Sequence, residues 1–299
     1  MRLIDKAYKY FWDNIVESGD RKRMEKQSLP DGVSAILDVP YIEDGKQAHL
    51  FDVYFPEGRE TEKLPTIIDI HGGGLMYAYK ELNKNYCYHL AKRGFAVINV
   101  SYSLCPEDRF PACLVDVLNA LQYVGKNIDV YPCDRERVFI TGDSAGGLLA
   151  AYACLATTSA ELRKVYGVGD VNLNIKAAGF TSGMFFFDSG LAAALSPGIF
   201  GKGGRKKSPY KNYLAFCDII DKGVFPPSYL VTSKEDMIHG ATVKFKQLLD
   251  DRGIENVIDD YPKGNGHKLE HVFSVLYPSE YPESRRTIDR MTDFFRSHC

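Results

Sequence analysis

The sequence lacks the long apolar runs and the strong charge imbalance that mark membrane and nucleic-acid-binding proteins. No apolar run approaches the ~20 residues that a helix needs to cross a bilayer. The chain has 37 Lys and Arg residues against 39 Asp and Glu residues, a formal net charge of −2. Such a balance argues against a nucleic-acid surface or an electrostatic membrane anchor as the main role. We therefore expect no nucleic-acid partner and no stable membrane association.

The seven cysteines are scattered, odd in number and without a C-x-x-C pair. This pattern favours reduced thiols over a disulfide framework or a zinc site. The first residues, MRLIDKAYKYFWDNIVES, are interrupted by Asp5, Lys6, Lys9 and Asp13, so they lack the uncharged core of a signal peptide. We expect a cytoplasmic protein.

The composition is otherwise that of a globular protein, and a length of 299 residues is compatible with one large α/β domain. Short β-rich segments bounded by Pro or Gly alternate with helix-like segments, which predicts a mostly parallel sheet covered by helices on both faces. The expected strands are 49–55, 66–70, 95–100, 137–141, 175–180, 228–233 and 256–261. The expected helices are 83–93, 111–127, 145–158, 240–252 and 283–297.

Two segments break this alternation. Residues 1–35 begin with apolar residues at helical spacing, including the only tryptophan, and such a helix must lie on the main body as a lid or on a partner. Residues 183–211 are too long for an ordinary connection, and we expect them to be a lid insertion. The basic run within it, 201–207, is interpreted as a solvated loop. A homodimer remains open.

The strongest local motif is Gly142-Asp-Ser-Ala-Gly-Gly147, between a predicted strand and a predicted helix. The G-x-S-x-G pattern places a serine on a tight strand-to-helix turn, where flanking glycines avoid side-chain clashes. The leading N–H groups of the helix then point at charge that develops near the hydroxyl. We predict that Ser144 is a nucleophile.

A second motif, His71-Gly-Gly-Gly74, follows the predicted strand 66–70. Successive glycines leave backbone N–H groups uncovered, as an oxyanion hole requires, and the residue after the nucleophile supplies one more. We assign the hole to the backbone amides of Gly72, Gly73 and Ala145.

These motifs resemble those of the α/β-hydrolases, in particular the HGGG-bearing esterase group of hormone-sensitive-lipase-like and carboxylesterase-type enzymes. Between them, Ser101-Tyr-Ser-Leu-Cys-Pro-Glu107 and Phe110-Pro-Ala112 are similar to the Y-R-L-A-P-E…F-P-A stretch of that group, with Ser103 in place of Arg and Cys105 in place of Ala. The resemblance covers residues 48–299 and implies an α/β-hydrolase fold.

A serine nucleophile needs a base and an orienting carboxylate, in the chain order Ser, Asp or Glu, His in this fold. Asp236, just after the strand 228–233, fits the acid better than its neighbour Glu235. Both His267 and His271 precede the final helix, and we favour His271 because Val-Phe follows it, as in the H-x-F pattern of the family. The pair also matches the zinc motif H-x-x-E-H, but the surrounding prolines and glycines leave no room for the long helix that motif needs. We expect no metal and no cofactor.

The predicted function is that of a serine carboxylesterase that acts on short- to medium-chain acyl, or acetyl, esters of small molecules. Aromatic side chains of Met184–Phe187, Phe11, Trp12, Tyr77 and Tyr79 either wall an apolar pocket or pack in the core. Two alternatives stay open: an acyl-peptide or amide hydrolase, and a non-catalytic ligand-binding protein on a hydrolase scaffold.

Overall fold

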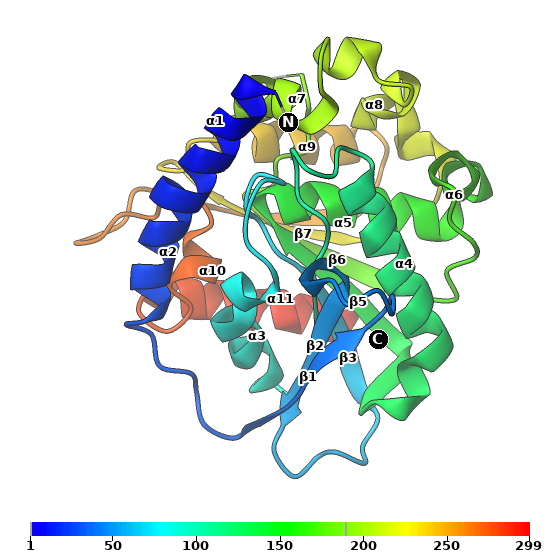
Figure 1. Cartoon of the computed structure of the whole chain (residues 1–299). Coiled ribbons are helices and arrows are strands. Elements are labelled where there is room, and N and C mark those ends of the chain that lie inside the picture. Colours follow the sequence, from blue (N-terminus) through cyan, green and yellow to red (C-terminus); the bar gives the residue numbers. More distant parts are fainter. Residues whose placement is uncertain (1, 189) are drawn as a thin grey trace.

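The centre of the molecule is an eight-stranded sheet (Figure 1), seen in a computed structural model that describes residues 2–188 and 190–299. The strand order is β1-β2-β4-β3-β5-β6-β7-β8. β2 runs antiparallel to both of its neighbours, and the strands from β4 to β8 are parallel. The strands are β1 Val33–Pro40, β2 Leu50–Pro56, β3 Leu64–Ile70, β4 Ala96–Val100, β5 Cys133–Asp143, β6 Ile175–Thr181, β7 Ser228–Ser233 and β8 Asn256–Tyr261.

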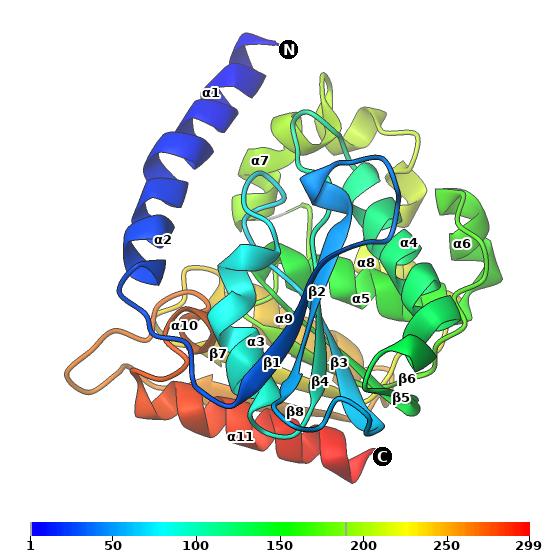
Figure 2. The same ribbon diagram turned by 60° about the horizontal axis from the view of Figure 1, so that its bottom comes forward.

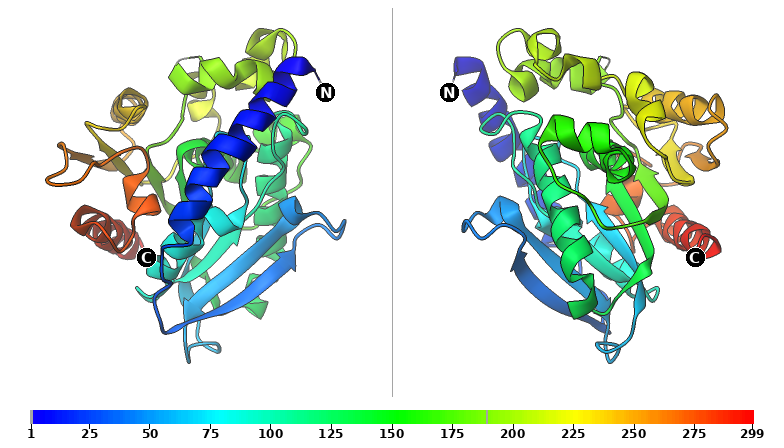
Figure 3. Two further views of the ribbon diagram at one scale, coloured as in Figure 1. Left: turned by 60° about the vertical axis from the view of Figure 1, so that its left-hand side comes forward. Right: turned by 90° about the vertical axis from the view of Figure 1, so that its right-hand side faces the viewer.

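Helices cover both faces of this sheet, so that the sheet lies between α4 and α11 (Figure 3). α4 and α5 bury their apolar side chains against one face, and α3 and α11 bury theirs against the other. The helices are α1 Leu3–Phe11, α2 Glu17–Met24, α3 Lys84–Ala91, α4 Ala112–Asn127, α5 Ser144–Thr158, α6 Ala160–Tyr166, α7 Gly190–Phe200, α8 Phe216–Ile219, α9 His239–Asp250, α10 Phe273–Leu276 and α11 Pro282–Ser297. Both helix layers lie against strands rich in Val and Ile, and the predicted α/β architecture is confirmed.

The edge strand β1 is absent from the strands expected from sequence. Its side chains are largely exposed, and the apolar run that marks the inner strands is interrupted at Asp38. Consequently residues 33–35, expected to belong to the N-terminal lid segment, are part of the sheet instead.

The N-terminal segment is one continuous helical rod beside the body of the molecule (Figure 2). It comprises α1, a π-helical stretch at Trp12–Val16, and α2. Trp12 is buried, whereas Leu3, Phe11 and Ile15 are exposed. The apolar residues of this helix are thus divided: Trp12 packs on the body of the molecule, whereas several others, Ile4 among them, lie at the surface.

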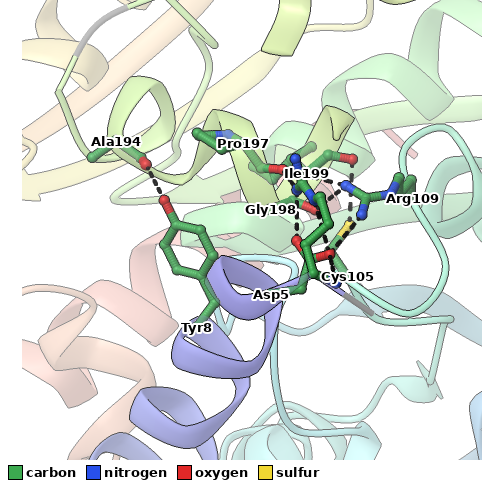
Figure 4. Close-up of polar contacts among 9 residues, drawn as sticks. Asp5, Tyr8, Cys105, Arg109, Ala194, Pro197, Gly198 and Ile199 are labelled. Carbon is green, nitrogen blue, oxygen red and sulfur yellow. Dashed lines mark hydrogen bonds and ion pairs between the residues drawn. The ribbon is translucent and has the colours of Figure 1, made fainter. Parts of the chain in front are cut away.

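An ion-pair cluster around the buried Asp5 carboxylate fastens α1 to α7 (Figure 4). The Asp5 carboxylate pairs with Arg2 at 2.6 Å and with Arg109 at 2.9 Å, and the Arg2 guanidinium also donates to the Pro197 carbonyl at 2.5 Å. Tyr8 Oη donates to the Ala194 carbonyl at 2.8 Å. The hydrogen bond from Arg2 lowers the pKa of Asp5 to about 2, so Asp5 is ionised at neutral pH.

The insertion of residues 183–211 contributes α7, which lies beside α1, and aromatic residues that pack in the hydrophobic core. Phe185 stacks on Phe245 of α9, with ring centroids 3.7 Å apart, and belongs to the core. Residues 1 and 189 fall within the two segments predicted to form the lid and lie outside the described residues. Within the ranges 2–188 and 190–299, no helix has the length and hydropathy needed to cross a bilayer.

Candidate active site

Ser144 stands on a sharp turn where β5 ends and α5 begins. Its backbone φ of +49° lies in the left-handed region that residues other than glycine rarely adopt. The turn needs glycine close by, because a Cβ on Gly146 would lie 2.7 Å from the carbonyl carbon of His71. The bend places the hydroxyl at the carboxyl end of the parallel strands, where ligands bind in open α/β sheets.

The structure brings together the three side chains that the sequence assigns to the triad. His271 Nε2 lies 2.9 Å from Ser144 Oγ, and His271 Nδ1 lies 2.8 Å from Asp236 Oδ1. Both distances are those of hydrogen bonds, and they join one imidazole to a hydroxyl on one side and a carboxylate on the other. This arrangement can remove the hydroxyl proton as the oxygen attacks an electrophile.

The Asp236 carboxylate is held in place by further donors. Thr232 Oγ1 donates to Oδ2 at 3.0 Å and the Ile238 amide donates to Oδ1 at 3.0 Å. Burial alone raises the pKa of Asp236, but the hydrogen bond and the charge of His271 outweigh that effect and bring the pKa below its ordinary value. Asp236 is therefore an anion at neutral pH, suited to stabilise a protonated imidazole.

Glu235, the weaker candidate for the acid, has a different place. Its Oε2 accepts hydrogen bonds from the amides of Gly264 at 2.9 Å and Leu269 at 2.8 Å. Both amides belong to the loop that carries His271. Glu235 thus fixes the loop that carries His271, a contact for which the sequence gives no local signal.

His267 lies apart from the triad. Its Nε2 is 2.9 Å from Glu283 Oε2 on α11, and its ring packs against Tyr281. The two histidines of the H-x-x-E-H match therefore have separate partners. Across the part of the chain that the structure describes, no three His, Cys, Asp or Glu side chains are grouped so as to hold a metal ion.

The turn at His71–Gly74 differs in detail from the predicted oxyanion hole. The Gly72 amide donates to Asp143 Oδ1 at 3.0 Å, so it is already engaged. The next two glycines, Gly73 and Gly74, line the pocket beside Ser144, and their amides have no partner among the described residues. The Ala145 amide belongs to the first turn of α5, where no intrahelical acceptor exists.

The other side of this turn is held by aromatic residues. His71 stacks on Tyr102 with ring centroids 4.3 Å apart, and Tyr102 Oη donates to the carbonyls of His71 at 2.8 Å and Gly72 at 3.0 Å. Burial lowers the pKa of His71 to about 4, so its ring is neutral at pH 7 and its role is structural.

A pocket of about 350 Å³ opens onto Ser144 and His271. Trp12 closes one side, stacked on Tyr77 with ring centroids 5.2 Å apart. Met237 lines both this pocket and a second hollow of about 270 Å³, which Met184 and Phe186 also line. Of the aromatic residues expected to form walls, Trp12 and Tyr77 line the main pocket, whereas Phe11 faces outward.

Comparison with known proteins agrees with this geometry. The family model BD-FAE matches residues 51–179. Esterase LipQ of Mycobacterium tuberculosis is 30% identical over 145 residues, which are 47% of this chain and 34% of LipQ. Probable carboxylesterase 6 of Arabidopsis thaliana is 35% identical over 111 residues, 34% of this chain and 32% of that protein. The match thus spans about a third of the length of these curated relatives.

Solved structures extend the likeness to nearly the whole chain. Esterase B from Lactobacillus rhamnosis superposes with a TM-score of 0.91 and 26% sequence identity, covering 99% of this chain and 96% of that one. The chain is an α/β-hydrolase. Its motifs resemble those of the HGGG-bearing esterase group, and the relatives named above are esterases and carboxylesterases by name.

Three further residues of this α/β-hydrolase lie at the site without having been expected there. They are Asp143, which holds Gly72, and the buried pair Asp69 and Asn83, which lie behind Asp143. Asp143 belongs to the G-x-S-x-G motif and could have been suspected from its position. No sequence signal marks the other two as neighbours of the site.

Proposed function

We propose that the protein is a serine carboxylesterase that hydrolyses short- to medium-chain acyl, or acetyl, esters of small molecules through an acyl-enzyme. The observation that carries the proposal is the chain of contacts from Asp236 through His271 to Ser144 Oγ at the edge of a pocket. Two alternatives, an amide hydrolase and a non-catalytic binding protein, are outcomes of the test below.

In the proposed mechanism, Ser144 Oγ bonds to the acyl carbon while its proton passes to His271 Nε2. Asp236 stabilises the imidazolium that forms and keeps the ring in the tautomer whose Nε2 is free to accept. The carbonyl oxygen becomes an oxyanion, which we assign to the amides of Gly73, Gly74 and Ala145. These replace the assignment that included Gly72, because the Gly72 amide is bonded to Asp143.

The tetrahedral intermediate then collapses. His271 returns its proton to the departing alcohol oxygen, and the acyl group remains on Ser144. A water molecule gives a proton to His271 and attacks the acyl carbon, and the acid is released as the proton returns to Ser144 Oγ. All catalytic groups in this mechanism belong to the chain, water is the only co-reactant, and the proposal includes no cofactor.

The pocket supports a small ester. Its volume of about 350 Å³ is at the lower end of the range of small-molecule sites. One crystal structure of esterase B from Lactobacillus rhamnosis concerns inhibition with a C4-C4 SN3 tributyrin phosphonate, and this supports acyl groups of similar length here. The proposal also includes a cytoplasmic location, because the seven cysteines are free thiols, which persist in reducing compartments.

The test compares p-nitrophenyl esters of increasing acyl length with matched anilides. We expect turnover of the esters, highest for short and medium chains, and labelling by an organofluorophosphonate that Ser144→Ala abolishes. Ser274→Ala is the matched control, because that hydroxyl is buried and has no partner among the described residues. Equal turnover of the anilides would favour an amide hydrolase. A folded protein with neither turnover nor labelling would favour a binding protein.

A further inference from the structure

Three polar side chains form a cluster beside the turn His71–Gly74, which carries the proposed oxyanion donors and is called the oxyanion turn below. Asp69 lies on β3, Asn83 ends the 3₁₀ turn Lys80–Asn83 that precedes α3, and Asp143 ends β5 directly before Ser144. Asp69 and Asn83 are 0% exposed, and Asp143 is 4% exposed. Burying carboxylates is costly unless their oxygens find donors, so the contacts within this cluster have to compensate for lost hydration.

One amide nitrogen connects the two acids. Asn83 Nδ2 donates to Asp69 Oδ2 at 2.9 Å and to Asp143 Oδ1 at 2.8 Å. The same Asp143 oxygen accepts the Gly72 amide at 3.0 Å. A continuous path of hydrogen bonds therefore runs from the sheet interior, through Asn83, to the first glycine of the oxyanion turn.

The charge distribution strengthens this path. Burial, together with the charge of Asp143, raises the pKa of Asp69 to about 8, and burial raises the pKa of Asp143 to about 6. At neutral pH Asp69 is protonated and Asp143 is ionised. A hydrogen bond from an amide to a carboxylate is about twice as strong as one to a neutral acceptor. The ionised Asp143 therefore holds the Gly72 amide more strongly than a neutral side chain would.

We propose that Asn83 is a positioning residue for the oxyanion turn: it holds the Asp143 carboxylate on the Gly72 amide and thereby fixes the direction of the Gly73 and Gly74 amides. The inference rests on the proposed function. The turn needs such a positioning residue because three glycines in succession do not fix their own backbone conformation. A displacement of about 1 Å in such a site can cost on the order of 10²-fold in rate.

The test is Asn83→Ala, with p-nitrophenyl butyrate as substrate. We expect kcat to fall about 10- to 100-fold while KM stays within about threefold, because the amides act on the oxyanion of the transition state rather than on the bound ester. Asn85→Ala is the matched control. Asn85 is also buried, lies two residues further along the chain, and has side-chain atoms without a partner among the described residues. We expect its kcat to be unchanged.

A second pair of variants, at Asp143, tests the positioning role independently of whether Asn83→Ala folds well. Asp143→Asn keeps an oxygen that can accept from Gly72 and Asn83, whereas Asp143→Ala removes it. We expect kcat of Asp143→Asn to exceed that of Asp143→Ala at least tenfold. Equal kcat in the two variants, or wild-type kcat in Asn83→Ala, would overturn the positioning role. Activity that survives Ser144→Ala would overturn the proposed function instead.

Discussion

Asp236 Oδ1 lies 2.8 Å from His271 Nδ1, and the Asp236 side chain is completely buried behind the imidazole. Asp236→Asn would present an amide N–H to Nδ1 and favour the tautomer that carries its proton on Nε2. That tautomer cannot accept the proton of Ser144, so we expect kcat to fall about 10⁴-fold with little change in fold. Steady-state kinetics and circular dichroism are the measurements.

Glu235→Gln is the control for this prediction, because the amide oxygen can still accept from Gly264 and Leu269. We expect it to retain kcat within about tenfold. A loss in Glu235→Gln as large as that in Asp236→Asn would contradict the assignment of Asp236 as the acid.

Replacing His271 and replacing His267 should have very different effects on kcat, although both residues lie in the same loop. His271→Gln removes the group that contacts Ser144, and we expect a loss of kcat on the order of 10⁴–10⁶-fold. His267→Gln removes a contact with Glu283 that is remote from the hydroxyl, and we expect kcat within about fivefold of wild type. Kinetics on one short ester measures both, and the reverse order would exclude His271 as the base.

Trp12 should limit the length of the acyl chain. It packs against the oxyanion turn so closely that a Cβ on Gly74 would lie 2.8 Å from its ring, and it closes one side of the pocket. We expect Trp12→Ala to raise kcat/KM for long-chain relative to short-chain p-nitrophenyl esters about tenfold or more. Phe11→Ala, on the outer side of the same helix, is the control. An unchanged chain-length profile in Trp12→Ala would be evidence against this wall.

The stability of the protein should depend on pH through Asp69. In the unfolded chain its pKa is about 3.9, and in the folded protein burial raises it to about 8. Between these values only the folded state holds the proton, so this group lowers the free energy of unfolding by about 1.4 kcal/mol for each unit that the pH rises.

Asp69→Asn removes this proton uptake but keeps an acceptor for Asn83. We expect the variant to gain stability relative to wild type as the pH rises from 5 to 8, measured by urea unfolding at both values. A difference that is the same at pH 5 and pH 8, or smaller at pH 8, would show that Asp69 is ionised in the folded state.

The sequence predicts most of the sheet because its inner strands are short apolar segments bounded by Pro, Gly or polar residues, a pattern that is visible in the sequence alone. The sequence does not predict β1, because an exposed edge strand such as Val33–Pro40 carries little of that apolar pattern. Ser144, Asp236 and His271 could be selected because each lies at a fixed place relative to a strand.

What the sequence does not predict depends on contacts between distant segments. The sequence does not distinguish among the three consecutive glycines. The Gly72 amide is hydrogen-bonded only because Asp143, 71 residues further along the chain, lies beside it in the fold. The burial of Asp5 in α1 likewise depends on Arg109, which no helical pattern indicates. Such pairings are set by tertiary packing, which overrides local propensity.

Because Trp12 is the only tryptophan of the chain and lies in the wall of the pocket, the tryptophan fluorescence of the unmodified protein comes from a single indole in the pocket that Ser144 also lines. Its emission therefore reports on the docking of the N-terminal rod and on the arrival of a ligand in one optical signal, without any label.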